Sequence, residues 1–421
     1  MNETILHCDL NGFYASVECL FRPELKNVPM AVSGNPENRH GIILAKNELA
    51  KKFGVATGET IWAAKRKCPE ITLVRPSRGK YSEYSQKVNA IYSRFTNKIE
   101  PFGIDESWLD VAASAKLFGD PVSIADTIRK TVREELGLTV SIGVSFNKIF
   151  AKFGSDYKKP DATTLISREN YKEIIYPQPV SALLYVGRRT AEALGKLGIK
   201  TVGELARADK KILSARFGKH GELIYNAANG IGDADVAFFG DEPDAKSIGN
   251  SVTYRRDLSG MEDFEAAILD LSETVSARML KEGVKCTTIS VSIKNTRLNT
   301  ITRQSRTDSP TNLSPEIFKT AMQIIKSEWD AGERVRMFGI ACGGLIPADS
   351  SPDQMSIFDE ENCARQKLKK MQEAVENVRA KFGRSSLRRA NIAFCDIFSE
   401  ADLPPSSLAK HNGVTKKRAQ Q

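Results

Sequence analysis

The sequence predicts an α+β protein of several domains, and three observations support this. Strand-like and helix-like patterns alternate over the first 160 residues, whereas residues 177–232 show helical patterns alone. Beyond residue 246 the order is strand, helix, strand, strand, helix, strand. The chain has 421 residues, which fits about three or four domains at roughly 150 residues each. Mixed strands and helices of this kind favour the α+β class.

The first region begins with a predicted strand at residues 4–9, which leads into a turn at Asn11-Gly12. A helix should follow, because Phe13, Val17 and Leu20 recur at spacings of three and four. The other elements of this region are assigned in the same way. Predicted strands cover residues 39–46, 98–104, 107–111 and 139–145, and predicted helices cover residues 48–53, 81–95 and 124–136.

Composition excludes two broad classes of protein. With 41% hydrophobic and 27% charged residues, the chain is too apolar to be wholly disordered. No apolar run approaches the ~20 residues of a membrane helix, and the start Met1-Asn2-Glu3 lacks the basic residues of a signal peptide. The seven cysteines form no C-x-x-C pair and the four histidines lie far apart, which argues against structural zinc. We therefore expect a cytoplasmic protein with reduced thiols and no membrane partner.

The charge of the chain is the first indication of function. Lysine and arginine number 61 against 52 acidic residues, which gives a formal net charge of +9. Such an excess suits a polyanionic partner, because basic side chains replace the counterions held along a phosphate backbone. A generic basic surface explains the same excess equally well.

The helical region contains a glycine motif at residues 185–191, YVGRRTA. A glycine turn between two helices can point backbone N–H groups and a helix N-terminus at a phosphate. This helix-hairpin-helix arrangement holds DNA without reading its bases. Gly187 and Arg188 are therefore candidate DNA contacts. The alternative is a corner between two helices that binds no ligand.

A polar, turn-rich segment at residues 237–245 predicts a linker to the last folded region. Strands are predicted there at residues 248–258, 286–294, 299–306 and 335–343, with helices at residues 264–281 and 315–329. The strand at 286–294 places Ile289, Val291 and Ile293 on one face and Ser290, Ser292 and Lys294 on the other. A basic, hydroxyl-rich sheet face can lie on a nucleic-acid backbone, so Ser290 and Lys294 are candidate DNA contacts. Solvated polar faces are common as well.

Three carboxylates stand where strands end or turn. Asp9 closes the first predicted strand, and Asp105-Glu106 lies at the turn of a predicted hairpin. If these side chains converge, their mutual repulsion is costly unless a divalent cation lies between them. Two such cations about 4 Å apart form the clamp that enzymes use for in-line phosphoryl transfer. The alternative is that all three are surface acids at turns.

Several motifs, in order, resemble those of Y-family DNA polymerases, the translesion enzymes of the bacterial DNA polymerase IV (DinB) and UmuC type. Two resemble palm motifs: residues 9–18, DLNGFYASVE, and residues 103–110, GIDESWLD. The others are a fingers-like motif at 51–55, a third palm-like motif at 141–152 with 158–160, a thumb-like region around Gly187, and a little-finger-like start at 251–254. The resemblance covers roughly residues 1–345.

This resemblance implies a right-hand polymerase with defined domain boundaries. The palm would comprise residues 1–19 and 77–166, the small fingers 20–76, the helical thumb 167–236, the linker 237–245 and a βαββαβ little finger 246–346. Residues 347–421 would form a flexible tail.

The resemblance also assigns the site. Asp9 and Asp105 would bind two magnesium ions, with the Leu10 carbonyl as a backbone ligand. Glu106 would hold the catalytic ion beside the primer 3′-hydroxyl.

Four residues would contact the incoming nucleotide. Lys159 and Lys51 would neutralise the triphosphate, Phe13 would stack near the sugar, and Tyr14 would be the steric gate that excludes a ribose 2′-hydroxyl. Glu48 and Lys51 depart from the tyrosine and arginine that many relatives have in the fingers, which we expect to turn Glu48 away from the triphosphate.

The tail contains two further features. Residues 354–358, Gln-Met-Ser-Ile-Phe, resemble the peptide by which bacterial polymerases hold the sliding clamp, the β subunit. Gln354, Met355, Ile357 and Phe358 would make that contact, since a flexible segment can bury apolar side chains in a groove. The basic run at residues 365–389 is either a helix that contacts DNA or a solvated helix face.

The sequence thus predicts a monomeric, low-fidelity, template-directed DNA polymerase for translesion synthesis and damage tolerance. Its partners would be primer-template DNA, deoxynucleoside triphosphates and the clamp. Two other functions remain open: a nucleotidyl cyclase built on a related palm, and a catalytically weak protein that occupies the clamp and primer end.

Overall fold

The computed structural model describes residues 4–34, 41–232, 235–241, 244–350, 359–390 and residue 397. The chain divides into two compact units: residues 1–37 with 41–242, and residues 38–40 with 243–421. Among the described residues, no helix is both long and apolar enough to cross a membrane.

A five-stranded sheet in the order β5-β6-β1-β7-β8 forms the centre of the first unit. Its strands pair antiparallel, except for the parallel pair of β7 and β8. They are β1 (Ile5–Leu10), β5 (Ile99–Pro101), β6 (Glu106–Asp110), β7 (Val140–Ser145) and β8 (Thr163–Ile166). The strands predicted from the sequence at 4–9, 98–104, 107–111 and 139–145 are confirmed, and β8 was not predicted.

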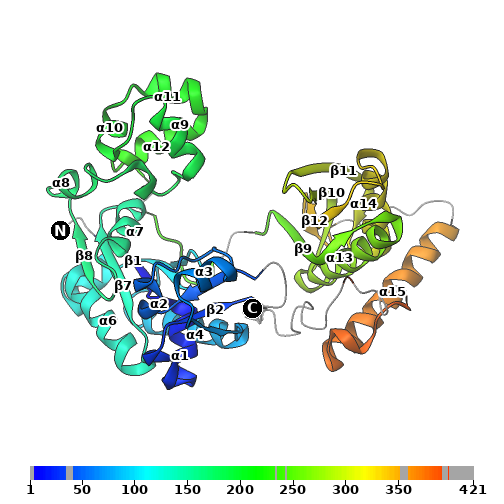
Figure 1. The fold of residues 1–421 in the computed structure, drawn as a ribbon, viewed down its shortest axis with the longest axis horizontal. Coiled ribbons are helices and arrows are strands. Elements are labelled where there is room, and N and C mark those ends of the chain that lie inside the picture. Colours follow the sequence, from blue (N-terminus) through cyan, green and yellow to red (C-terminus); the bar gives the residue numbers. More distant parts are fainter. Residues whose placement is uncertain are drawn as a thin grey trace, which may run out of the picture. The chain divides into compact units, whose positions relative to one another are not determined.

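Helices pack on both faces of this sheet (Figure 1). They include α1 (Phe13–Phe21), α4 (Arg78–Tyr92), α6 (Pro121–Leu136) and α7 (Lys148–Tyr157). Leu6, Cys8 and Leu10 of β1 share a core with α4 and α6, whereas Ile5 packs against Ala151 of α7 on the opposite face. Because side chains alternate along a strand, His7 and Asp9 lie on the face that carries α7.

The close approach of α7 to β7 depends on one glycine. A β-carbon on Gly143 would lie 1.9 Å from the carbonyl oxygen of Ala151, so no larger residue fits there. This contact fixes the depth at which α7 presents Lys152 and Ser155 to the sheet. The sequence patterns did not identify α7, although they did predict α1, α4 and α6.

A smaller sheet in the order β3-β2-β4 forms a second core in this unit. Its elements are β2 (Met30–Ser33), β3 (Ile43–Lys46), β4 (Thr72–Val74), α2 (Glu48–Lys52) and α3 (Ile61–Lys67). The sequence predicted β3 and α2 only. Strands of three or four residues are too short to show a clear period of two, which explains the two that were missed.

Residues 171–232 contain helices and no strand, as the sequence predicts. The helices are α8 (Tyr171–Ile175), α9 (Arg188–Gly195), α10 (Val202–Arg207), α11 (Lys210–Phe217) and α12 (Lys219–Ala228). Gly187 lies between the short 3₁₀ helix Val180–Ala182 and α9, of which it is the N-cap residue. The turn between α9 and α10 contains Gly198, whose φ of +80° is the left-handed conformation that glycine tolerates.

The second unit has the βαββαβ order that the sequence predicts. Its sheet runs β11-β10-β12-β9, and β13 pairs with the start of β10. The elements are β9 (Ser247–Leu258), α13 (Gly260–Glu282), β10 (Val284–Asn295), β11 (Thr300–Thr311), α14 (Ser314–Glu328), β12 (Val335–Gly343) and β13 (Ile346–Pro347). Ile289, Val291 and Ile293 are buried against both helices, so the predicted alternation of β10 is confirmed.

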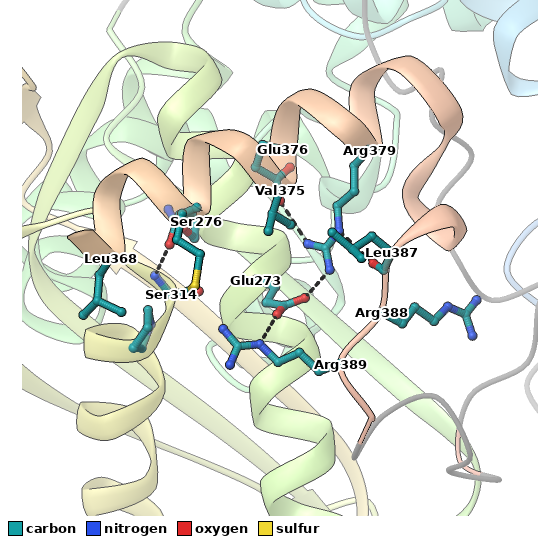
Figure 2. Close-up of a pocket in the computed structure, with 13 residues that line it drawn as sticks. Glu273, Ser276, Ser314, Leu368, Val375, Glu376, Arg379, Leu387, Arg388 and Arg389 are labelled. Carbon is teal, nitrogen blue, oxygen red and sulfur yellow. Dashed lines mark hydrogen bonds and ion pairs between the residues drawn. The ribbon is translucent and has the colours of Figure 1, made fainter. Parts of the chain in front are cut away.

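Part of the predicted flexible tail is ordered, which corrects that prediction. Residues Asp359–Phe382 form α15, which packs on the helical side of the second unit (Figures 1 and 2). The buried Gln372 donates to Ser276 Oγ at 2.8 Å, and its Oε1 accepts from the backbone N–H of Ser314 at 2.8 Å. Its amide therefore fastens α15 to both α13 and α14.

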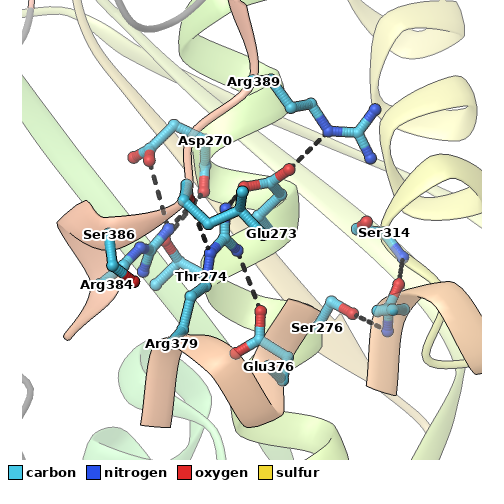
Figure 3. Close-up of polar contacts among 12 residues, drawn as sticks. Asp270, Glu273, Thr274, Ser276, Ser314, Glu376, Arg379, Arg384, Ser386 and Arg389 are labelled. Atoms are coloured by element: carbon cyan, nitrogen blue, oxygen red, sulfur yellow. Dashed lines mark hydrogen bonds and ion pairs between the residues drawn. The ribbon is translucent and has the colours of Figure 1, made fainter. Parts of the chain in front are cut away.

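Ion pairs continue this contact along α13 (Figure 3). Arg379 meets Glu273 at 2.8 Å, and both side chains are about nine-tenths buried. Arg389 also pairs with Glu273 at 2.6 Å, and Arg384 pairs with Asp270 at 3.2 Å. Several arginines of the basic run at residues 365–389 therefore point toward α13. Its partners lie about 100 residues earlier in the chain, so local sequence patterns could not show them.

A pocket of about 290 Å³ lies between α15 and the two helices beneath it (Figure 2). Apolar side chains of α15 line much of it, and the Glu273 ion pairs lie at one end. Its lining residues include Leu368, Met371, Val375 and Leu387.

Candidate active site

The register of two strands brings the predicted carboxylates together. Asp9 on β1 is the direct cross-strand partner of Glu106 on β6, so their side chains lie on the same face of the sheet. The backbone N–H of Leu10 donates to the Asp105 carbonyl at 2.9 Å, which holds the turn before β6 against the end of β1. A β-carbon on Gly103 would lie 3.6 Å from both Asp105 Oδ1 and Glu106 Oε1. These two oxygens therefore flank the same turn.

Lysines neutralise two of the three carboxylates. Lys159 Nζ lies 2.7 Å from Asp9 Oδ2 and 2.7 Å from Asp156 Oδ1. Lys152 of α7 pairs with Glu106 Oε2. With these pairs in place, the described residues contain no group of three His, Cys, Asp or Glu side chains close enough to hold a metal ion.

The surroundings separate the pKa values of the carboxylates. Burial, together with the charges of Asp9 and Glu106, raises the pKa of Asp105 to about 6. Burial also raises the pKa of Asp9, although Lys159 opposes this. For Glu106, burial is outweighed by the contacts with His7 and Lys152, which lower its pKa to about 2.

This donor set fits a divalent cation. Asp105 is mostly buried beside two other carboxylates, and this burial and the two negative charges raise its pKa. Oxygen ligands of this kind suit Mg²⁺ or a similar hard cation. Lys159 and Lys152 contribute positive charge at the same site, so their pairs with Asp9 and Glu106 compete with such an ion.

Tyr14 lies beside this site. Its ring stacks on the buried Tyr81 with centroids 4.1 Å apart and planes 10° from parallel. Burial raises the pKa of Tyr14, and the Asp105 charge adds to this effect. Gly12, with a φ of +52°, precedes α1 and sets the direction in which this helix, with Tyr14 in its first turn, leaves β1.

The nucleotide-stacking role predicted for Phe13 is not supported, because its ring is only 3% exposed. Phe13 packs into the core beneath α1, on the helical face that also carries Val17. An i, i+4 spacing of apolar residues is typical of a core-facing stripe, and here that simpler interpretation holds.

The remaining predicted residues belong to other secondary-structure elements. Lys51 and Glu48 form an exposed pair at 3.4 Å on α2, so Glu48 points toward Lys51. Arg188 is exposed at the start of α9, 3.3 Å from Glu192. On the polar face of β10, Ser290 Oγ donates to Gln304 at 3.4 Å. Residues 354–358, the predicted clamp peptide, lie outside the described residues.

Comparisons with known proteins show the family of this chain. The model of the impB/mucB/samB family matches residues 8–156, and that of its C-terminal domain matches residues 245–357. The DNA polymerase IV of Acetivibrio thermocellus is 45% identical over 389 residues, which cover 92% of this chain and 97% of that protein. The DNA polymerase IV of Clostridium kluyveri is 35% identical over 397 residues, or 93% and 98% of the two chains.

This chain belongs to the DNA polymerase IV family. Members of this family are Y-family, DinB-type DNA-directed DNA polymerases of the translesion type. A solved chimeric Y-family DNA polymerase matches the fold with a TM-score of 0.71 at 21% identity, over 82% of this chain and 99% of that one. The architecture is therefore the right-hand polymerase fold of palm, fingers, thumb and little finger, as the sequence motifs implied.

Sequence reasoning missed three residues of the candidate site. His7 of β1 and Lys152 of α7 contact Glu106, and Ser155 of α7 contacts His7. The available signal was the spacing of His7 and Asp9, because residues two apart on a strand share a face. Lys152 and Ser155 could not be placed without α7, which the sequence patterns did not identify.

Proposed function

We propose that this chain is a low-fidelity translesion polymerase that adds deoxynucleotides to a primer 3′-hydroxyl by two-metal phosphoryl transfer. The observation that carries this proposal is the cross-strand pair of Asp9 and Glu106 with Asp105 at the adjoining turn. Magnesium bound there would neutralise the charge that develops on the attacking and leaving oxygens. Asp9, Asp105 and the Leu10 carbonyl would hold the ions, and Glu106 would face the primer end.

Two lysines would bind the triphosphate. Lys159 already lies against Asp9, so it can exchange that carboxylate for a phosphate oxygen without moving far. Lys51 is exposed on the fingers and pairs only with the exposed Glu48 among the contacts described for it. Tyr14 would act as the steric gate, because it lies at the start of α1 near Asp105 and its ring stacks on Tyr81.

The thumb and little finger would hold primer-template DNA chiefly by its phosphates. Gly187 and Arg188 are exposed at the N-terminus of α9, where a helix favours an anion. Ser290 and Lys294 lie on the sheet face opposite α13 and α14. We propose the boundaries palm 1–19 and 77–166, fingers 20–76, thumb 167–236, linker 237–245 and little finger 246–346. The enzyme would act as a monomer and bind the sliding clamp through residues 354–358.

Replacing Asp105 with alanine tests the proposed function. In a primer-extension assay with Mg²⁺ and four deoxynucleoside triphosphates, Asp105→Ala should abolish nucleotide addition and leave primer-template binding intact. Asp126→Ala is a matched control, since Asp126 is a half-exposed acid on α6 far from the site in sequence. Near-normal extension by Asp105→Ala would refute the assignment. Cyclic nucleotide formation, or DNA binding without extension by the parent, would favour the two alternative functions instead.

A further inference from the structure

His7 is fully buried between the central sheet and α7. Its exposed fraction is 0%, and its ring makes an edge contact with Trp108 at a centroid distance of 5.3 Å. The two ring nitrogens face different partners. Nδ1 lies 2.8 Å from Ser155 Oγ, and Nε2 lies 3.3 Å from Glu106 Oε2. His7 therefore connects α7 with a carboxylate of the polymerase site.

The partners of the two ring nitrogens determine which nitrogen of His7 carries the proton. Nε2 lies 3.3 Å from the carboxylate oxygen Oε2 of Glu106, so a lone pair on Nε2 would face an oxygen lone pair and be repelled. If His7 is neutral, Nε2 carries the hydrogen and Ser155 donates its hydroxyl hydrogen to Nδ1. If His7 is charged, both nitrogens donate, and Ser155 donates instead to the Lys152 carbonyl at 2.8 Å. In both states Nε2 is a donor toward Glu106.

The two oxygens of Glu106 have different surroundings. Oε2 lies in contact with both His7 Nε2 and Lys152 Nζ. Oε1 lies on the side of the Gly103 turn, where a β-carbon on Gly103 would be 3.6 Å from Oε1 and 3.6 Å from Asp105 Oδ1. The His7 contact is long, and Nε2 has no well-aligned hydrogen bond among the described residues while Lys152 shares the same oxygen. Lys152 is a flexible side chain on a helix, whereas the His7 ring is fixed by its burial.

We propose that His7 is a positioning residue, which donates from Nε2 to Glu106 Oε2 and so keeps Oε1 turned toward Asp105. This role rests on the proposed function, because it concerns the carboxylate assigned to the primer end. Without His7 the carboxylate would have Lys152 as its sole partner on this side among the contacts described, and the Glu106 carboxylate could rotate away from Asp105. Groups that orient a ligand in this way typically contribute 10–100-fold to metal affinity or activity.

Nuclear magnetic resonance of the imidazole nitrogens tests the geometry without any turnover. The chain has four histidines, so ¹⁵N-histidine labelling gives few signals, and His7→Gln identifies the one from His7. A signal from protonated Nε2 in the metal-free protein is expected. A lone pair on Nε2 would overturn the proposal, whatever the activity of the enzyme.

Variants test the consequence for Glu106. His7→Leu should lower kcat and the affinity for Mn²⁺, measured by electron paramagnetic resonance, by 10–100-fold each, with little change in KM for primer-template. His7→Gln should stay within about threefold of the parent, because its amide can reach the position of Nε2. Ile5→Val is the matched control, since Ile5 is buried on the same face of β1 without a polar contact to Glu106.

Each outcome decides the question. Parent-like kcat and Mn²⁺ affinity in a folded His7→Leu variant, or equal losses in His7→Leu and Ile5→Val, would overturn the proposal. If His7→Leu does not fold, His7→Asn replaces it, because an asparagine amide reaches Ser155 but not Glu106. Equal activity of His7→Asn and His7→Gln would then refute the role. If the parent does not extend primers, the proposed function fails, but the ¹⁵N signal of His7 and the Mn²⁺ affinity still test whether His7 orients Glu106.

Discussion

At the scale of single residues, the aromatic ring of Tyr14 has an unusual amount of support for a surface-facing side chain. It stacks flat on Tyr81, which is itself 1% exposed and hydrogen-bonded to Glu18 at 2.7 Å. A gate must resist displacement when a larger sugar enters. A ring backed by a buried ring meets that requirement, because the core behind it is close-packed and cannot yield easily.

Replacing Tyr14 with alanine should therefore increase ribonucleotide incorporation. Forcing a hydroxyl against a well-supported ring costs about 1–3 kcal/mol, which corresponds to roughly 5–150-fold in kcat/KM. Single-nucleotide insertion kinetics with a ribonucleotide and the matching deoxynucleotide measure this ratio. Tyr14→Phe keeps the ring and is the control, with discrimination like that of the parent. If Tyr14→Ala discriminates as the parent does, another residue is the gate.

The sequence identified the residues of this site that form compact motifs. Asp9, Asp105 and Tyr14 belong to short sequence motifs around strand ends, where local patterns carry the most information. Lys152 and His7 could not be found in this way, because their roles depend on how deeply α7 packs on β7. That depth follows from the space above Gly143, which is a property of two distant segments. The spacing of Phe13 fits both a core stripe and a binding residue, and the structure places its ring in the core.

At the scale of secondary-structure elements, Glu18 ties α1 to the start of α4. It is fully buried, and its Oε1 accepts from Tyr81 Oη at 2.7 Å and from the Ser77 N–H at 3.1 Å. Burial alone would raise the pKa of Glu18, but the bonds from Tyr81, Arg22 and Ser77 outweigh it and lower the pKa below 4.5.

Replacing Glu18 with glutamine should destabilise the enzyme by about 1–3 kcal/mol near neutral pH, as for loss of hydrogen bonds to a buried charge. Because the folded pKa lies below the unfolded one, this stabilisation is complete above about pH 4.5 and disappears as the pH falls through the folded value. Denaturant unfolding at pH 7 and pH 4 measures the change. Glu83→Gln, an exposed carboxylate on α4, should have little effect. A loss that is the same at both pH values would contradict this account.

The contact between α15 and α13 is the second element-scale feature, and it centres on one buried ion pair. Removing one partner of such a pair typically costs 3–5 kcal/mol, because it leaves a buried charge unpaired. Here Glu273 also has Arg389, and Arg379 also has Glu376, so each remaining charge keeps a partner. The loss should therefore lie nearer 1–3 kcal/mol.

Double-mutant cycles test this contact. Arg379→Met and Glu273→Leu should each speed hydrogen exchange in α15, and the double variant should lose less than the sum of the two single losses because both remove the same ion pair. Glu373→Gln changes an exposed carboxylate on the same helix and serves as the control. Strictly additive effects would show that Arg379 and Glu273 do not stabilise α15 as a pair.

Long elements could be predicted from the sequence, and short or charge-stabilised ones could not. The six main elements of the little finger follow from clear periods of two and 3.6 residues. The fingers strands are too short for such patterns. α15 has a periodic sequence, but its high charge resembles that of a solvated tail. Asp270, Glu273 and Glu316, which pair with its arginines and those just after it, lie in helices that only the fold brings near.

At the scale of the whole molecule, the chain separates catalysis from attachment. Asp9, Asp105 and Glu106 lie in the first unit, and the sequence that resembles a clamp peptide belongs to the second. The chain on both sides of that peptide is fastened to the little finger. β13 pairs with β10 before it, and α15 packs on α13 after it. A clamp contact made there would therefore hold the little finger as a body.

Replacing Ile357 and Phe358 with alanine should remove clamp-stimulated synthesis and preserve clamp-independent single-nucleotide addition. Burying these two side chains contributes roughly 1.5–3 kcal/mol each before ordering costs, which predicts weak to moderate affinity. A tether to a ring that encircles DNA raises the local concentration of polymerase at the primer end without changing its chemistry. Product lengths with and without the clamp measure processivity, and Ser356→Ala is the control within the same peptide. Equal stimulation of the parent and the double variant would place the clamp contact elsewhere on the enzyme.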